Sequence, residues 1–152
     1  MIVQIIEVQD LMLRSIRDSI VKASSIEAIY LSSDGKSAIN TYKRYHPNLL
    51  IIDVELPKMS GLQLAETIIG FKSNSRILMI SGHINEAIVC GISRLHGISG
   101  FLFKSGNFFH ELNCAIARIV RNEHHFCTKY RNLVYQYLRS GKKLDAILGF
   151  KE

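Results

Sequence analysis

The chain has 152 residues, of which 47% are hydrophobic and 21% charged, and it carries a formal charge of +6. This length and composition are typical of one globular domain with an appendage. They exclude a disordered chain and leave too little length for two ordinary domains. No apolar stretch reaches membrane-spanning length and no signal-peptide pattern is present, so we expect a cytoplasmic protein without a membrane partner.

Cysteine content and the location of the charge add two further constraints. Cys90, Cys114 and Cys127 are odd in number and widely spaced, which fits reduced thiols better than a disulfide framework. Residues 123–152 carry six Lys and Arg against three Asp and Glu. A basic surplus can favour nucleic acid, but no dense basic run with interleaved aromatic residues is present, so the pattern favours a solvated basic tail.

Apolar runs of strand length alternate with segments whose apolar residues have helical spacing. The strand-like runs lie at residues 2–6, 26–31, 49–52, 77–80 and 98–103, and the clearest helical segments lie at 11–23, 61–71 and 107–121. Five strands alternating with five helices predict an α/β fold, in which a doubly wound five-stranded parallel sheet is covered on both faces.

The pattern changes after Arg121. Five apolar or aromatic residues fall at helical spacing there: Tyr130, Leu133, Val134, Tyr137 and Leu138. Gly141 then precedes a short apolar group at residues 144–148. We therefore expect a first domain over residues 1–122 and a helical extension, or a linker towards an output domain, over residues 123–152. The apolar face of the extension needs a partner, which is the domain itself, a second copy or an output domain outside this sequence.

Charged and hydroxyl side chains follow four of the strand-like runs. Glu7 follows the first run, Asp53 the third, Ser81 the fourth and Lys104 the fifth. The carboxyl ends of parallel strands meet at one edge of the sheet, where ligands bind in such folds, so we expect these residues to converge. The set suits phosphoryl transfer, in which the carboxylate is the nucleophile while hydroxyl, ammonium and a divalent cation neutralise the transferring group.

At this point residues 2–121 resemble the receiver domain of two-component response regulators, a (βα)5 flavodoxin-like fold. The residues that match are Asp53, Leu56, Pro57, Gly61, Ser81, Gly82 and the stretch 97–104. The resemblance implies that Asp53 is the phosphoryl acceptor, that Ser81 and Lys104 bind the phosphoryl group, and that Phe101 is an aromatic switch. A simple core role for Phe101 is almost equally compatible with its half-buried aromatic character.

The stretch 97–104, with Ser105 after Lys104, most resembles receivers of helix-turn-helix (LuxR-type) transcriptional regulators. The resemblance implies phosphorylation by a sensor histidine kinase, a phosphotransfer protein or a small donor. It also implies a switched surface at the fourth helix, fifth strand and fifth helix, and a homodimer. DNA binding would belong to an output domain outside this chain, and no turnover of a separate substrate is expected, so the chain is not predicted to be an enzyme.

The departure from the family lies after the first strand. The family usually places two adjacent acids there, the second binding Mg²⁺ directly, whereas this sequence reads Glu7-Val8. Val8 supplies no oxygen, so we expect weak Mg²⁺ binding through Glu7, Asp53 and Glu55. Glu55 either supplies an oxygen or repels the incoming phosphoryl group. Asp10 is expected to be the N-cap of the first helix rather than a substitute ligand.

Two alternatives remain. In the first, the chain is a degenerate receiver, an interaction or dimerisation module that does not depend on phosphorylation; Val8 favours it, while Asp53, Ser81 and Lys104 together oppose it. In the second, the same site at the carboxyl edge of the sheet belongs to an enzyme such as a small-molecule phosphatase. The absence of room for a substrate-binding subdomain argues against that enzyme.

Overall fold

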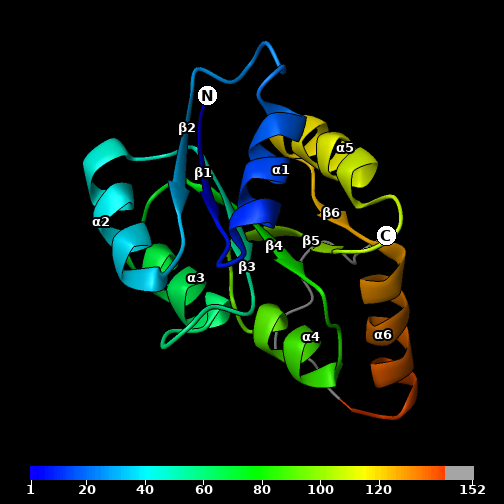
Figure 1. The fold of residues 1–152 in the computed structure, drawn as a ribbon. Helices are drawn as coiled ribbons and strands as arrows, with labels where there is room; N and C mark the ends of the chain where they lie inside the picture. Colours follow the sequence, from blue (N-terminus) through cyan, green and yellow to red (C-terminus); the bar gives the residue numbers. More distant parts are fainter. Residues whose placement is uncertain (143–152) are drawn as a thin grey trace.

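The computed structural model describes residues 1–142 and has a single parallel sheet at its centre (Figure 1). The strands follow the spatial order β2-β1-β3-β4-β5-β6. Their bounds are β1 Ile2–Ile6, β2 Ala28–Ser32, β3 Leu49–Asp53, β4 Arg76–Ser81, β5 Ile98–Phe103 and β6 His125–Phe126. All five pairings between neighbouring strands are parallel, as the alternation of strands and helices predicts.

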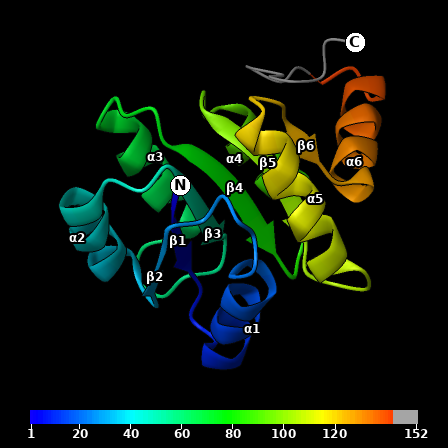
Figure 2. The ribbon, with the colours of Figure 1, turned by 90° about the horizontal axis from the view of Figure 1, so that it is seen from above.

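Helices cover both faces of this sheet. Their bounds are α1 Asp10–Ile20, α2 Gly35–Tyr45, α3 Gly61–Gly70, α4 Glu86–Ser93, α5 Phe108–Val120 and α6 Thr128–Arg139. Figure 2 shows α1 and α5 together on one face, α2, α3 and α4 on the other, and α6 beyond the edge formed by β6. The doubly wound architecture is therefore confirmed.

Burial along the strands explains why the apolar runs lie where they do. Every residue of β3 is buried, because this central strand has neighbours on both sides and helices on both faces. In β2, at the edge of the sheet, only Ser32 is buried. The helices bury a single stripe, as α1 does with Leu13, Ile16 and Ile20. The core thus lies between the central strands and these stripes.

Two local predictions were wrong. The sheet has six strands among the described residues rather than five, because β6 is only two residues long and has no alternation that a pattern would reveal. The N-cap of α1 is Gln9, whose backbone is extended (φ −80°, ψ 111°), and not Asp10. Asp10 is already the first helical residue, and its exposed carboxylate accepts a hydrogen bond from Arg14 Nε at 2.9 Å.

A β-bulge interrupts the pairing of β4 with β5. Ile77 is opposite Ile98, but the next residue, Leu78, is opposite Gly100, so Ser99 is an extra residue in β5. On the other side of β5, a Cβ atom at Gly100 would lie 2.2 Å from the carbonyl oxygen of His125. Glycine at this position is what lets β6 approach closely enough to pair.

After β6 the chain continues into α6, which packs against α4 and β5. This helix lies within the segment where the apolar spacing predicts one. The second apolar group, at residues 144–148, lies outside the described residues. No helix between residues 1 and 142 has both the length and the apolar character needed to cross a bilayer.

Candidate functional site

The carboxyl edge of the sheet brings together three of the side chains that the sequence singles out. Glu7 follows β1, Asp53 ends β3, and Lys104 follows β5. The Lys104 ammonium donates to Glu7 Oε2 and to Asp53 Oδ2, at 2.8 Å each. Three segments far apart in sequence are therefore joined at one point by a cation between two carboxylates.

Burial makes this ion triad electrostatically strong. The side chains of Glu7 and Asp53 are 0% and 3% exposed, and that of Lys104 is 11% exposed. Burial alone would lower the pKa of Lys104, but its hydrogen bonds with Asp53 and Glu7 outweigh this effect and hold the pKa above its ordinary value. Lys104 is thus a fixed positive charge beside Asp53.

The pKa of Glu7 is also raised, but for a carboxyl group this favours the neutral form. Burial raises its pKa, and the hydrogen bonds from Lys104 and from the Gln9 backbone N–H to its carboxylate lower it only in part. The nearby charge of Asp53 raises it further. The site therefore resists an additional negative charge unless a cation comes with it.

Backbone contacts hold Asp53 at the end of β3. The N–H of Glu55 donates to Asp53 Oδ1 at 3.1 Å, and the N–H of Gly61 donates to the carbonyl of Val54 at 2.8 Å. A Cβ atom at Gly61 would lie 2.0 Å from the backbone oxygen of Asp53. The glycine at the start of α3 is therefore required for the loop after β3 to fold back over the acidic residue.

Ser81 ends β4 directly opposite Phe103 and is fully buried. Its hydroxyl accepts a hydrogen bond from the His83 N–H at 3.0 Å, and its carbonyl accepts from the Lys104 N–H at 2.8 Å. This backbone bond ties the end of β4 to the residue that carries the ammonium. Ser81 and Lys104 therefore belong to one rigid corner.

The oxygen donors at this edge fit a divalent cation only in part. Glu7 and Asp53 each give one carboxylate oxygen to Lys104, while Glu55 turns away, with its Oε1 atom 3.4 Å from His83 Nε2. Within residues 1–142, no group of three His, Cys, Asp or Glu side chains gathers to hold a metal. Val8 presents a half-exposed hydrocarbon side chain where the family usually has an acid.

Phe101 lies inside the protein rather than at the carboxyl edge of the sheet. Its side chain is completely buried, and its ring is 5.2 Å from that of Tyr130 in α6, measured between centroids. The sequence pattern did not reveal this partner, which is 29 positions further along the chain. Any outward movement of the Phe101 ring would meet Tyr130.

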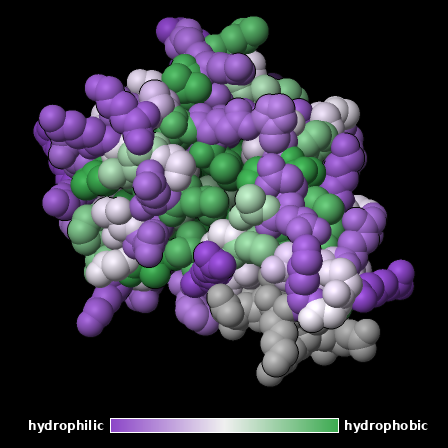
Figure 3. Space-filling view, turned by 90° about the horizontal axis from the view of Figure 1, so that it is seen from below, coloured by the Kyte–Doolittle hydropathy of each residue, from purple (hydrophilic) through white to green (hydrophobic). Residues whose placement is uncertain are grey.

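Two features of the carboxyl edge were not predicted. His83 faces Glu55, and both side chains are more than half exposed. Val8 and Leu11 are exposed hydrophobic residues just after β1. Figure 3 views the molecule from below and shows hydrophobic residues surfacing in the middle of this side among hydrophilic ones. The carboxyl edge of the sheet thus carries exposed apolar side chains beside charged ones.

The family model of the response regulator receiver domain matches residues 3–113 of this chain. With the sheet order and the Glu7–Lys104–Asp53 triad in place, this match shows that the chain belongs to the receiver domain family. Its relatives include the probable transcriptional regulatory protein NarL of Mycobacterium tuberculosis (strain H37Rv), 30% identical over 92 residues, which are 58% of this chain and 42% of NarL. The transcriptional regulatory protein DegU of Brevibacillus brevis is 24% identical over 104 residues, covering 67% of this chain and 44% of DegU.

The chain thus spans less than half the length of these curated relatives. Among solved structures, the isolated receiver domain of RcsB from Salmonella enterica serovar Typhimurium, with phosphomimetic BeF3⁻, has a TM-score of 0.80 at 22% identity. That match covers 88% of this chain and 97% of the RcsB domain. A LuxR-family response regulator from Aurantimonas sp. SI85-9A1 has a TM-score of 0.81 at 19% identity, covering 90% and 97%. Both matches continue past α5, since residues 1–121 are only about four fifths of the chain.

Proposed function

We propose that this chain accepts a phosphoryl group on Asp53 and passes on the resulting change through its surface to a transcriptional output domain. The observation that carries the proposal is the triad, in which a buried strand-end carboxylate is held against a buried ammonium at 2.8 Å. This arrangement supplies a nucleophile and a positive charge that neutralises the transferred group.

In this reaction an Asp53 carboxylate oxygen forms a bond to phosphorus while the bond between phosphorus and the donor breaks. The leaving group keeps the electron pair and takes its proton from solvent or from the donor protein. Lys104 then faces the oxygens of the phosphoryl group, and the Ser81 hydroxyl rotates towards them. Because the ammonium contacts Asp53 Oδ2, attack by that oxygen requires the ammonium to move from its present position.

We infer that Mg²⁺ binds here, but weakly. It would be held by Glu7 and Asp53, and it would supply positive charge to offset that of the phosphoryl group. Val8 contributes no ligand, and Glu55 reaches the site only if it leaves His83. The same two carboxylates must be shared with Lys104, which reduces the free energy available for binding the cation.

The partners follow from the same chemistry. The phosphoryl donor is a sensor histidine kinase, a phosphotransfer protein or a small acyl phosphate in the cytoplasm, and the mixed apolar and charged surface at the carboxyl edge of the sheet is where such a donor protein docks. Two copies pair when the α4-β5-α5 surface changes. DNA is contacted by a domain outside this chain, and no separate substrate is turned over.

The test is the intact mass of the protein after incubation with acetyl phosphate and Mg²⁺. We expect the wild-type chain to gain the mass of one phosphoryl group and the Asp53→Ala variant to gain none. Asp10→Ala is the matched control, because it removes an exposed carboxylate at the same edge and should be modified like the wild type. An adduct that persists in Asp53→Ala would refute the assignment.

The degenerate receiver is the second candidate function, favoured by the hydrocarbon side chain of Val8 in place of an acid. In that case the triad is a structural ion pair and the chain acts as an interaction module. An unmodified wild-type protein under conditions that modify a Val8→Asp variant would support it.

A further inference from the structure

The segment after α5 returns to the receiver and covers its β5 edge. Residues 125–139, called the latch below, comprise β6 and α6. The Cys127 N–H donates to the Phe101 carbonyl at 2.9 Å, and Gly100 and Phe101 pair with His125 and Phe126. The latch therefore occupies the strand edge that β5 would otherwise expose to a second chain.

The latch also reaches α4. Helix α6 packs along α4, and Lys142, just after α6, pairs with Glu86 at the start of α4 at 3.0 Å. Figure 1 shows α6 running beside α4, outside the sheet. Together these contacts cover the α4-β5 part of the surface that the family resemblance assigns to signalling.

Contacts of the latch lead directly to the acceptor site. The Tyr130 ring closes over Phe101, and the Lys129 ammonium lies 3.9 Å from the centroid of the Phe103 ring. Lys104, which holds Asp53 and Glu7, directly follows Phe103 at the end of β5. Residues that touch the latch and the residue that binds the acceptor thus lie within four consecutive positions of the chain.

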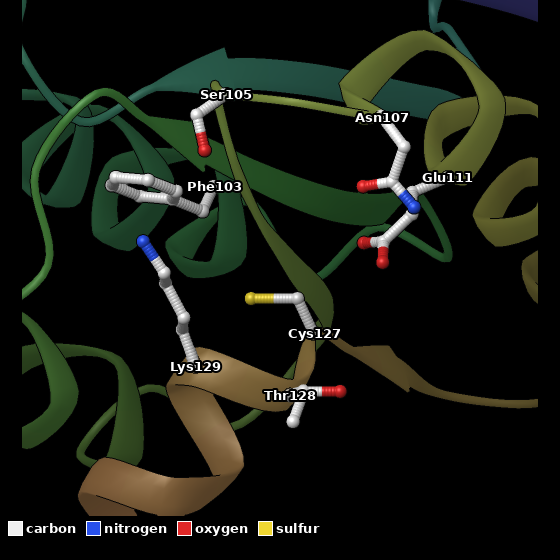
Figure 4. A pocket seen from close by; sticks show the side chains of 7 residues that line it. All are labelled: Phe103, Ser105, Asn107, Glu111, Cys127, Thr128 and Lys129. Carbon is white, nitrogen blue, oxygen red and sulfur yellow. The ribbon is translucent and has the colours of Figure 1, made fainter.

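The latch is only lightly attached. Tyr130 and Val134 are the buried residues of α6, whereas α5 buries five of its thirteen. A half-open pocket of about 120 Å³ lies between the start of α6 and the start of α5, lined by residues that include Asn107, Glu111 and Lys129 (Figure 4). Segments with few buried contacts open at a lower free energy than the core.

We propose that the latch is an intramolecular clamp whose release and the phosphorylation of Asp53 favour each other. With the latch in place, Tyr130 prevents the Phe101 ring from moving, and the end of β5 keeps Lys104 on both carboxylates. A phosphoryl group on Asp53 displaces Lys104 and so loosens the strand that the latch grips. Release uncovers the β5 edge and α4 for a second copy. The coupling rests on the acceptor function proposed above.

The test compares two substitutions at adjacent positions of α6 in the full chain. Val134→Asp places a charge on the buried face of α6, and Tyr135→Asp places the same charge on its half-exposed face. Amide hydrogen exchange of residues 125–139 reports release, and titration with beryllofluoride and Mg²⁺ reports the acceptor site. Coupling predicts that Val134→Asp speeds exchange and strengthens beryllofluoride binding by about fivefold or more, while Tyr135→Asp changes neither.

Reciprocity supplies the second measurement, because beryllofluoride must then shift the wild-type latch towards its open state and so speed its exchange. If Val134→Asp disrupts the core, Gly100→Ala replaces it, since its Cβ atom meets the His125 carbonyl and expels β6. A freed latch with unchanged beryllofluoride affinity overturns the coupling alone. Unchanged exchange in both variants overturns the latch. Absence of beryllofluoride binding in every protein overturns the acceptor function, and the coupling with it.

Discussion

Replacing Lys104 by methionine tests whether the triad is as strongly coupled as its geometry implies. Methionine keeps an unbranched apolar side chain close to the lysine stem in length but leaves Glu7 and Asp53 buried without their shared cation. Removing one partner of a buried ion pair costs about 3–5 kcal/mol. Protonation of Glu7, whose pKa is already raised by burial, relieves part of this cost, so we expect a loss of about 3 kcal/mol at neutral pH.

The assay is urea denaturation, with thermal melting as a second measure; a loss of this size lowers the melting temperature by about 6–12 °C. The deficit should shrink towards acidic pH as Glu7 becomes protonated, and adding Asp53→Asn to Lys104→Met should restore part of the stability. Lys142→Met is the control, since its pair with Glu86 is half exposed and should contribute no measurable stability. A loss at Lys104 no larger than that of the control would refute the coupling of the triad.

Three further outcomes are expected. Val8→Asp should strengthen Mg²⁺ binding by about tenfold, or about 1.4 kcal/mol, as measured by a spectroscopic titration. Equal affinities of the two proteins would mean that the native acids already supply the ligand that Val8 lacks. Glu7→Gln should be more stable than the wild type at neutral pH. The pKa of Glu7 is raised in the folded state, so the wild type loses stability as pH rises through that pKa, whereas the glutamine variant does not. Denaturation curves should show that the stability difference between the two proteins vanishes below the ordinary pKa of glutamate. Gly61→Ala should lose about 1–3 kcal/mol in urea, since its Cβ atom meets the backbone of Asp53, while Gly70→Ala, with open space around it, should lose none.

The sequence predicts the centre of this protein well because the responsible signals are local. Asp53 ends a continuous apolar run, and a charge in that place marks the carboxyl edge of a buried parallel strand. The same reasoning located Lys104 after β5, and the two side chains meet at 2.8 Å. Hydrophobic periodicity and the positions of strand ends are enough to predict where a residue lies when a single strand or helix sets its place.

Prediction failed where the position depends on a distant part of the chain. β6 can pair with β5 only because Gly100 has no side chain. The two residues of β6 are too few to show a strand pattern in the sequence. The sequence left the role of Glu55 open, and its contact with His83, from the loop after another strand, carries no local signal. The cap of α1 was assigned to Asp10 by residue preference, but the backbone leaves β1 in a way that makes Gln9 the last extended residue.

The bulge at Ser99 bears on which changes of chain length β5 can accept. Ser99 pairs with no residue of β4, so deleting it would leave Ile98 opposite Ile77 and Gly100 opposite Leu78, as they are now. Lys104 would keep its level beside the two carboxylates. Deleting Leu102, which pairs with Ile80, would instead draw Lys104 back by one position along β4, about 3.3 Å, and away from both carboxylates. In this strand, loss of the bulged residue and loss of a paired residue should thus have opposite effects on the site.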